Sequence, residues 1–137
     1  MQWKCLLGEY RAPLLAVAAV WAASQYDSFQ LPWDLGGPPP YDEQRLAYAE
    51  TVRSRTRQTL QAIRSAQPAA AGVFTARFAH CVSQDAAAWS AAAPDAGGGG
   101  RGNVTLVSGL AYALSAGRAA APWGVDSCDG FDCGRRT

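Results

Sequence analysis

The chain lacks several features that mark common classes of protein. Its 137 residues carry a net charge of only +1, which argues against a nucleic-acid-binding protein held by contacts to phosphates. Its longest apolar run, residues 13–23, is too short to cross a membrane as a helix. With one histidine and four cysteines the chain offers few metal ligands, and we expect neither a bound metal nor a cofactor. A single domain of this size can still bury a hydrophobic core.

Cysteine is scarce but even in number. Four cysteines suit two disulfides, which can pair in three ways: Cys5, Cys81, Cys128 and Cys133. Disulfides persist in oxidising compartments. The sequence Asn103-Val104-Thr105 is an acceptor for N-glycosylation, which makes Asn103 a candidate for modification. Both features indicate a secreted, extracellular protein.

The apolar run at residues 13–23 shows no alternation of polar and apolar side chains, which is typical of a parallel strand buried on both faces. It leads directly into the polar segment 25–27, and we therefore predict a strand. The alternative interpretation is the apolar core of a signal peptide. Residues 31–41 contain three consecutive prolines and two glycines, and we expect a flexible loop there.

A long amphipathic helix follows from Asp42, which can cap its start. Apolar residues recur every three or four positions from Leu46 to Ile63, and the helix should end near Pro68. Several arginines fall mostly off this apolar stripe, and we expect a solvated face rather than a site for anionic substrates. These arginines are Arg45, Arg53, Arg55, Arg57 and Arg64. A second strand is predicted at 73–78.

Strand, loop, helix, loop and strand make a βαβ unit, the building block of a doubly wound, mostly parallel sheet. The segments predicted after it are a helix at 82–93, a flexible loop at 94–102, a second helix at 104–117 and a cysteine-containing tail at 122–137. We expect Trp33 and Trp89 to pack in the core rather than to line a pocket. The fold class is therefore α/β.

One acid and the only histidine follow the two predicted strands. Asp27 comes shortly after the first strand and His80 shortly after the second. In open α/β sheets ligands bind outside the carboxyl ends of the strands, so both side chains should lie on that side. The order of acid and then histidine is that of the last two members of an α/β-hydrolase triad. The ordinary alternative is a turn-capping aspartate and a surface histidine.

No nucleophile accompanies this pair. The G-x-S-x-G motif that carries the serine of α/β-hydrolases is absent from the sequence, and no HGGG-like segment for an oxyanion hole precedes Asp27. A triad needs all three groups, because the histidine must take its proton from a hydroxyl. The residues alone therefore predict an acid and a base without a serine.

The phrases around these residues resemble the pectin acetylesterase and Notum family of carboxylesterases. Plant members carry A-Y-D-S-W-Q after an apolar strand, and the chain has Q-Y-D-S-F-Q at residues 25–30. Members carry Y-A-H-C-Q at the histidine, and the chain has F-A-H-C-V at residues 78–82. The tail at residues 125–133, V-D-S-C-D-G-F-D-C, is similar to V-D-S-C-P-W-P-H-C in Notum. Cys5 and Trp89 also stand where family members have the same residue types.

The resemblance implies that residues 1–137 are the C-terminal part of a single secreted α/β-hydrolase domain, with an incomplete sheet. It implies that Asp27 is the triad acid and His80 the triad base, and that the family's serine lies upstream in a G-C-S-A-G-G segment, which this sequence does not contain. The full enzyme would be monomeric and would remove O-acetyl groups from a pectin-like polysaccharide of the cell wall. The chain alone should be inactive.

Two departures from the family and two alternatives accompany this interpretation. Arg77 and Thr137 stand where the family has cysteines, which would fit the joint loss of one disulfide. The first alternative is a truncated, non-catalytic paralogue that binds carbohydrate or regulates an enzyme. The second is a small disulfide-stapled secreted domain with residues 13–23 as its leader. We expect no nucleic acid among the partners.

Overall fold

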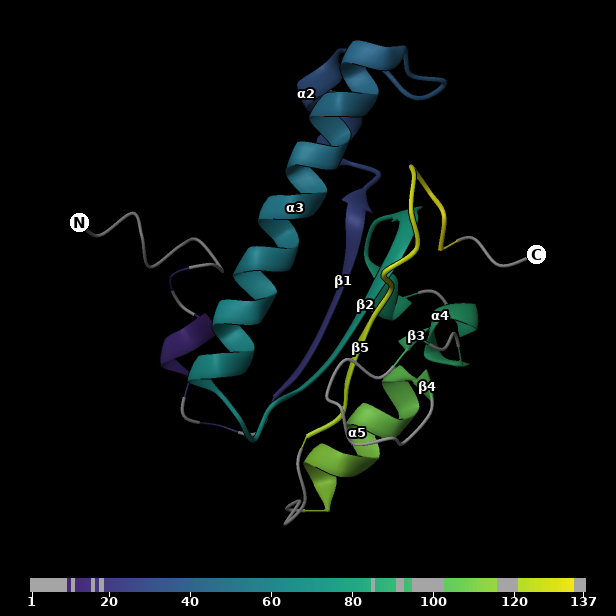
Figure 1. The fold of residues 1–137 in the computed structure, drawn as a ribbon. Helices are drawn as coiled ribbons and strands as arrows, with labels where there is room; N and C mark the ends of the chain where they lie inside the picture. Colours follow the sequence, from purple (N-terminus) through teal and green to yellow (C-terminus); the bar gives the residue numbers. More distant parts are fainter. Residues whose placement is uncertain are drawn as a thin grey trace.

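A three-stranded parallel sheet forms the centre of the computed structural model. The structure describes residues 10, 12–15, 17, 19–84, 86–90, 93–94, 103–115 and 121–134. The strands lie in the order β1 (Val20–Asp27), β2 (Ala71–Ala79) and β5 (Trp123–Val125), all parallel (Figure 1). The predicted α/β class is confirmed at this level.

The predicted βαβ unit is present. Helix α3 spans Glu43–Ala66 and connects β1 to β2, and the Asp42 side chain accepts a hydrogen bond of 2.8 Å from the backbone N–H of Arg45 at its start. This is the N-capping role expected of an aspartate at that position. The register pairs Val20 with Ala71 and Asp27 with Ala79, so the carboxyl ends of β1 and β2 lie side by side.

Two predicted boundaries are wrong. The first strand begins at Val20 rather than at residue 13, and Ala12–Leu14 form the 3-10 helix η2. Pairing sets this start, because Val20 lies opposite the first residue of β2. The loop predicted from residue 31 contains the short helix α2, Gln30–Leu35. Proline is tolerated in a first helical turn, where its missing N–H is not needed, so Pro32 does not prevent this helix.

The tail contributes a strand that the sequence did not predict. β5 has only three residues, which gives no readable periodicity, and it is recognised by its pairing with β2 from Gly72 to Phe74. Gly72 permits this packing, because a Cβ there would lie 2.6 Å from the Trp123 ring. The ring of Phe74 stacks on that of Trp123 with centroids 5.5 Å apart.

The two remaining predicted helices are present in shorter form, as η3 (Val82–Gln84) with α4 (Ala86–Ser90) and as α5 (Leu106–Leu114). The sequence did not predict the short strands β3 (Ala93–Pro94) and β4 (Asn103–Val104), which pair antiparallel. Thr105 and Ser108 form a capping box at the start of α5. Most of the flexible loop predicted at 94–102 lies outside the described residues.

Helices cover both faces of the sheet (Figure 1). Successive side chains of a strand point to opposite faces. Accordingly, Phe74 packs in a cluster with Leu60 and Ile63 of α3, whereas Val73 packs in a second cluster with Leu106 of α5. No helix among the described residues is long and apolar enough to cross a membrane.

Candidate active site

Asp27 and His80 meet at the carboxyl edge of the sheet. The backbone N–H of Ser28 donates a 3.1 Å hydrogen bond to the carbonyl of Ala79, which ties the two strand ends together. Nδ1 of His80 then lies 2.7 Å from Oδ2 of Asp27. The sequence placed both residues at this edge because each follows a strand, and the parallel register brings them into contact.

The carboxylate of Asp27 is held from both sides. Its Oδ1 accepts hydrogen bonds of 2.8 Å from the backbone N–H groups of Phe29 and Gln30, while Oδ2 faces His80. Burial raises the pKa of Asp27, but the hydrogen bonds from Gln30, His80 and Phe29 outweigh it and leave the pKa below its usual value. Asp27 is therefore an ionised, oriented acceptor at neutral pH.

His80 presents its other nitrogen to solvent. Its side chain is 48% exposed, and its ring leans on that of Phe29 with centroids 5.5 Å apart. Within the described part of the chain no group is hydrogen-bonded to Nε2. A neutral imidazole whose Nδ1–H is donated to a carboxylate carries its basic lone pair on Nε2. The arrangement can accept a proton from a hydroxyl or water placed against Nε2.

A β-bulge in β2 precedes the pair. The register shifts between Ser24 and Tyr26, where β2 holds one residue more than β1, and the Ser24 hydroxyl accepts a hydrogen bond of 3.1 Å from the Tyr26 N–H and donates one to the carbonyl of Arg77. Bulges redirect side chains and occur often beside functional sites. Beyond the slip, Gln25 and Tyr26 are fully buried, whereas Asp27 reaches the surface.

A largely buried polar cluster includes Tyr26, the neighbour of Asp27, and among its members only the side chain of Glu50, 43% exposed, reaches solvent. We call Gln25, Tyr26, Glu50 and Arg53 the Arg53 cluster. Nε of Arg53 donates to Oε1 of Gln25 at 3.0 Å, and Nη1 lies 3.4 Å from Oε2 of Glu50. The Tyr26 hydroxyl donates to Glu50 and also lies 3.1 Å from the carbonyl of Gly130. Burial and the hydrogen bond to Glu50 raise the pKa of Tyr26.

The expectation that all five arginines of α3 form a solvated face is wrong for Arg53, which is 6% exposed. Its spacing carried the signal. Arg53 stands four residues after Ala49 and seven before Leu60, which places it on the buried stripe of the helix. Charged side chains are fully buried almost only when paired, so an arginine on such a stripe predicts buried partners.

The predicted disulfide cysteines separate into three groups. Cys128 and Cys133 form a disulfide. Cys81 is exposed and forms no disulfide with a described residue. Cys5 lies outside the described residues. The glycosylation candidate Asn103 is exposed in β4.

The two tryptophans singled out in the sequence behave differently. Trp89 packs against the cluster of Val73 and Leu106, as expected, and donates from Nε1 to the carbonyl of Ser83 at 2.9 Å. The expectation of packing is wrong for Trp33, which is 81% exposed. Trp33 lies on α2, one helical turn after Phe29, whose ring is also exposed. Leu31 of the same helix is fully buried, so Trp33 lies on a face of α2 turned away from the core.

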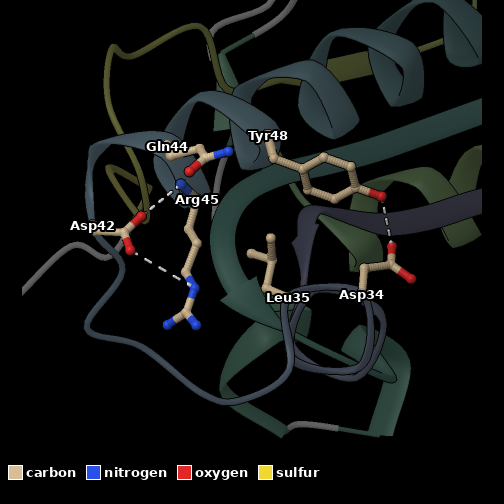
Figure 2. Close-up of a pocket in the computed structure, with 6 residues that line it drawn as sticks. All are labelled: Asp34, Leu35, Asp42, Gln44, Arg45 and Tyr48. Carbon is tan, nitrogen blue, oxygen red and sulfur yellow. Dashed lines mark hydrogen bonds and ion pairs between the residues drawn. The ribbon is translucent and has the colours of Figure 1, made fainter.

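A shallow hollow of about 520 Å³ lies between α2 and the start of α3 (Figure 2). The Tyr48 hydroxyl points at Asp34 and donates a 3.0 Å hydrogen bond to its Oδ2, which raises the pKa of Tyr48. On the other side the guanidinium of Arg45 lies 3.9 Å from Asp42. The walls of the hollow are therefore mostly polar, and the sequence analysis assigned Asp42 and Arg45 to a helix cap and a solvated helix face rather than to a hollow.

The nucleophile remains the missing component of the site. Among the described residues no serine is hydrogen-bonded to Nε2 of His80, in keeping with the absence of a G-x-S-x-G motif from the sequence. Comparisons of this chain with protein-family models, with curated proteins and with solved structures find no match.

Proposed function

We propose that this chain carries the acid–base pair of a carboxylic ester hydrolase that resembles the pectin acetylesterases. The observation that supports it most is the 2.7 Å contact between Nδ1 of His80 and a carboxylate that two backbone N–H groups hold in place. An oriented acid behind a solvent-facing imidazole is the arrangement that a Ser-His-Asp mechanism requires.

In this mechanism His80 acts as general base and then as general acid. Nε2 takes the proton of a serine hydroxyl while its oxygen attacks the acyl carbon, and the imidazolium that forms is stabilised by Asp27. The imidazolium then gives the proton to the departing alcohol of the polysaccharide, and water releases the acetyl group as acetate by the same two steps. The motif that carries the nucleophilic serine is not in this sequence, so the chain by itself should not hydrolyse alkyl acetyl esters.

The exposed aromatic rings beside His80 favour a carbohydrate as the substrate. Phe29 and Trp33 are 67% and 81% exposed and lie one helical turn apart, and the Phe29 ring contacts that of His80. The electron-rich face of an aromatic ring attracts the C–H groups on the flat face of a sugar. An O-acetylated polysaccharide could thus rest on these rings with an acetyl group near Nε2. Secretion, a cell-wall location and a monomeric state belong to the same proposal.

Activated aryl esters test the pair without the serine. Nε2 of an imidazole can attack p-nitrophenyl acetate directly, expelling p-nitrophenolate, and water then hydrolyses the acetylimidazole. We expect the chain to release p-nitrophenolate with turnover, beyond the single equivalent that the exposed Cys81 thiol can release, and we expect His80→Gln to abolish this turnover. Asp27→Asn should lower it on the order of tenfold, less than the roughly 10²–10⁴-fold of a complete acid–base group.

Acetylated pectin serves as the matched substrate, and we expect no acetate release from it. Equal rates of p-nitrophenolate release from the chain and from His80→Gln would contradict the proposal. Acetate release from pectin that survives His80→Gln would contradict it as well, because another residue would then carry the chemistry.

A second candidate, a non-catalytic carbohydrate-binding module, is favoured by the exposure of Trp33 alone. It predicts binding to polygalacturonan that Trp33→Ala abolishes and His80→Gln leaves unchanged, together with an imidazole no more reactive than that of a histidine peptide. Isothermal titration with pectin oligosaccharides and the p-nitrophenyl acetate assay together separate the two functions.

A further inference from the structure

Strand β2 is longer than its neighbour β5 and continues past the end of their pairing. β5 pairs with β2 only from Gly72 to Phe74, although β2 continues to Ala79 and leads into His80. An unpaired strand end in a half-buried position leaves N–H and C=O groups without partners, which is costly. The partners of Ala76 and Phe78 on this edge therefore matter for the position of His80.

Side chains of the tail supply those partners. The N–H of Ala76 donates to Oδ2 of Asp126 at 3.0 Å, and the N–H of Phe78 donates to Oδ1 of Asp132 at 2.6 Å. The carbonyl of Ala76 accepts from the N–H of Gly134 at 3.1 Å. Residues 126–134, which we call the tail loop, thus continue the hydrogen-bond ladder of β2 where no strand remains.

The tail loop also packs against side chains of β1 and β2. Its Phe131 ring contacts the ring of Tyr26, with centroids 5.1 Å apart, and that of Phe78, at 5.3 Å. Tyr26 and Phe78 stand one and two residues before Asp27 and His80. The Cys128–Cys133 disulfide closes the part of the loop that makes these contacts.

We propose that the tail loop acts as a substitute strand that holds His80 against Asp27, with Asp132 as a positioning residue. This inference concerns how the contact between His80 and Asp27 is maintained, and it rests on the proposed function. A hydrogen bond from a backbone N–H to a carboxylate is charge-assisted, so it secures the end of β2 more firmly than an ordinary ladder bond. Loss of the hydrogen bond between Phe78 and Asp132 allows the end of β2 before His80 to open locally.

The residue Asp132 allows a conservative and a disruptive replacement. Its backbone is left-handed, with φ 57°, a conformation that asparagine tolerates and glycine adopts freely. Asp132→Asn keeps an oxygen that can accept from Phe78, whereas Asp132→Gly removes the acceptor without straining the backbone. Asp129→Gly is the matched control, because Asp129 is an exposed aspartate of the same loop.

The measurement is exchange with water of the His80 Nδ1 proton, followed by NMR in the intact chain, which has a single histidine. Asp132→Gly should speed this exchange about tenfold, the change in local opening expected on losing a hydrogen bond to a charged group. Asp132→Asn should restore it largely, and Asp129→Gly should leave it unchanged.

A lower unfolding midpoint in Asp132→Gly with unchanged Nδ1 exchange would overturn the inference, because the loop would then be merely structural. Absence of a protected Nδ1 proton in the unaltered chain would instead remove the proposed acid–base pair itself, and the inference with it. If Asp132→Gly does not fold, the unaltered chain is treated with a dithiol reductant. The reductant converts the Cys128–Cys133 disulfide to two thiols and itself becomes a cyclic disulfide. Faster exchange of the His80 Nδ1 proton would then support the positioning role of the tail loop, whereas unchanged exchange would overturn it.

Discussion

Tyr26 and Asp27 are neighbours in the chain but belong to two different polar groups. Asp27 pairs with His80 at the surface, where the histidine side chain is 48% exposed. Tyr26 is fully buried within the Arg53 cluster. Both groups place an acid beside a nitrogen-bearing cation or base, so their chemistry is alike. Exposure separates them, because only the surface pair can meet a substrate.

The same difference sets their contributions to stability. A buried, fully bonded polar network becomes very costly when one member is lost, since the others keep their desolvation penalty. A solvent-exposed pair contributes little, because water replaces the missing partner. We therefore expect the Arg53 cluster to hold the fold and the Asp27–His80 pair to perform the chemistry.

The largest expected effect comes from Arg53→Met. It removes the donor to Oε1 of Gln25 and to the carbonyl of Cys128 and breaks the ion pair with Glu50, and should lower the free energy of unfolding by about 3 kcal/mol. Urea unfolding measures this change. Arg57→Met on the exposed face of the same helix is the control and should stay within about 0.5 kcal/mol. Equal losses of unfolding free energy in Arg53→Met and Arg57→Met would contradict the claim that the Arg53 cluster holds the fold.

Tyr26→Phe should have the next largest effect. It removes the hydroxyl that donates to Glu50, at a cost of about 1–2 kcal/mol at neutral pH. Because the pKa of Tyr26 is raised in the folded state, this stabilisation is complete below about pH 10 and declines as the pH rises toward the folded-state value. Unfolding experiments at pH 7 and above pH 10 should show the difference between the two proteins shrink. A difference that grows with pH would contradict the buried position of the hydroxyl.

Asp27→Asn should change stability least, by less than about 1 kcal/mol at neutral pH. The pKa of Asp27 is lowered on folding, so its contribution is present above about pH 4 and disappears as the pH falls through the folded-state value. Acid unfolding between pH 5 and pH 2 should accordingly be less steep in the variant. An identical acid transition would mean that the carboxylate gains nothing from its partners.

The exposed pair was predictable and the buried cluster largely was not. Asp27 ends β1 and His80 directly follows β2 in one βαβ unit, and parallel register brings such positions together without further information. The Arg53 cluster depends on the bulge of β2 opposite Gln25 and on the tail carbonyls of Cys128 and Gly130, which are remote in sequence. Contacts of this kind leave no periodic pattern.

Short elements explain the other differences. β5 has three residues and α2 has six, so each is stabilised by its neighbours rather than by a pattern of its own. The exposure of Trp33 follows from the position of α2 at the carboxyl edge of the sheet (Figure 1). Arg53 is the member of the Arg53 cluster whose helical spacing gave a usable signal.

The tautomer of His80 tests the central claim most directly. Long-range ¹H–¹⁵N spectra of the single imidazole report which ring nitrogen carries the proton when the ring is neutral. We predict a proton on Nδ1, donated to Asp27, with Nε2 unprotonated, and a loss of this preference in Asp27→Asn. A neutral imidazole protonated mainly on Nε2, with the same spectrum in both proteins, would contradict the account.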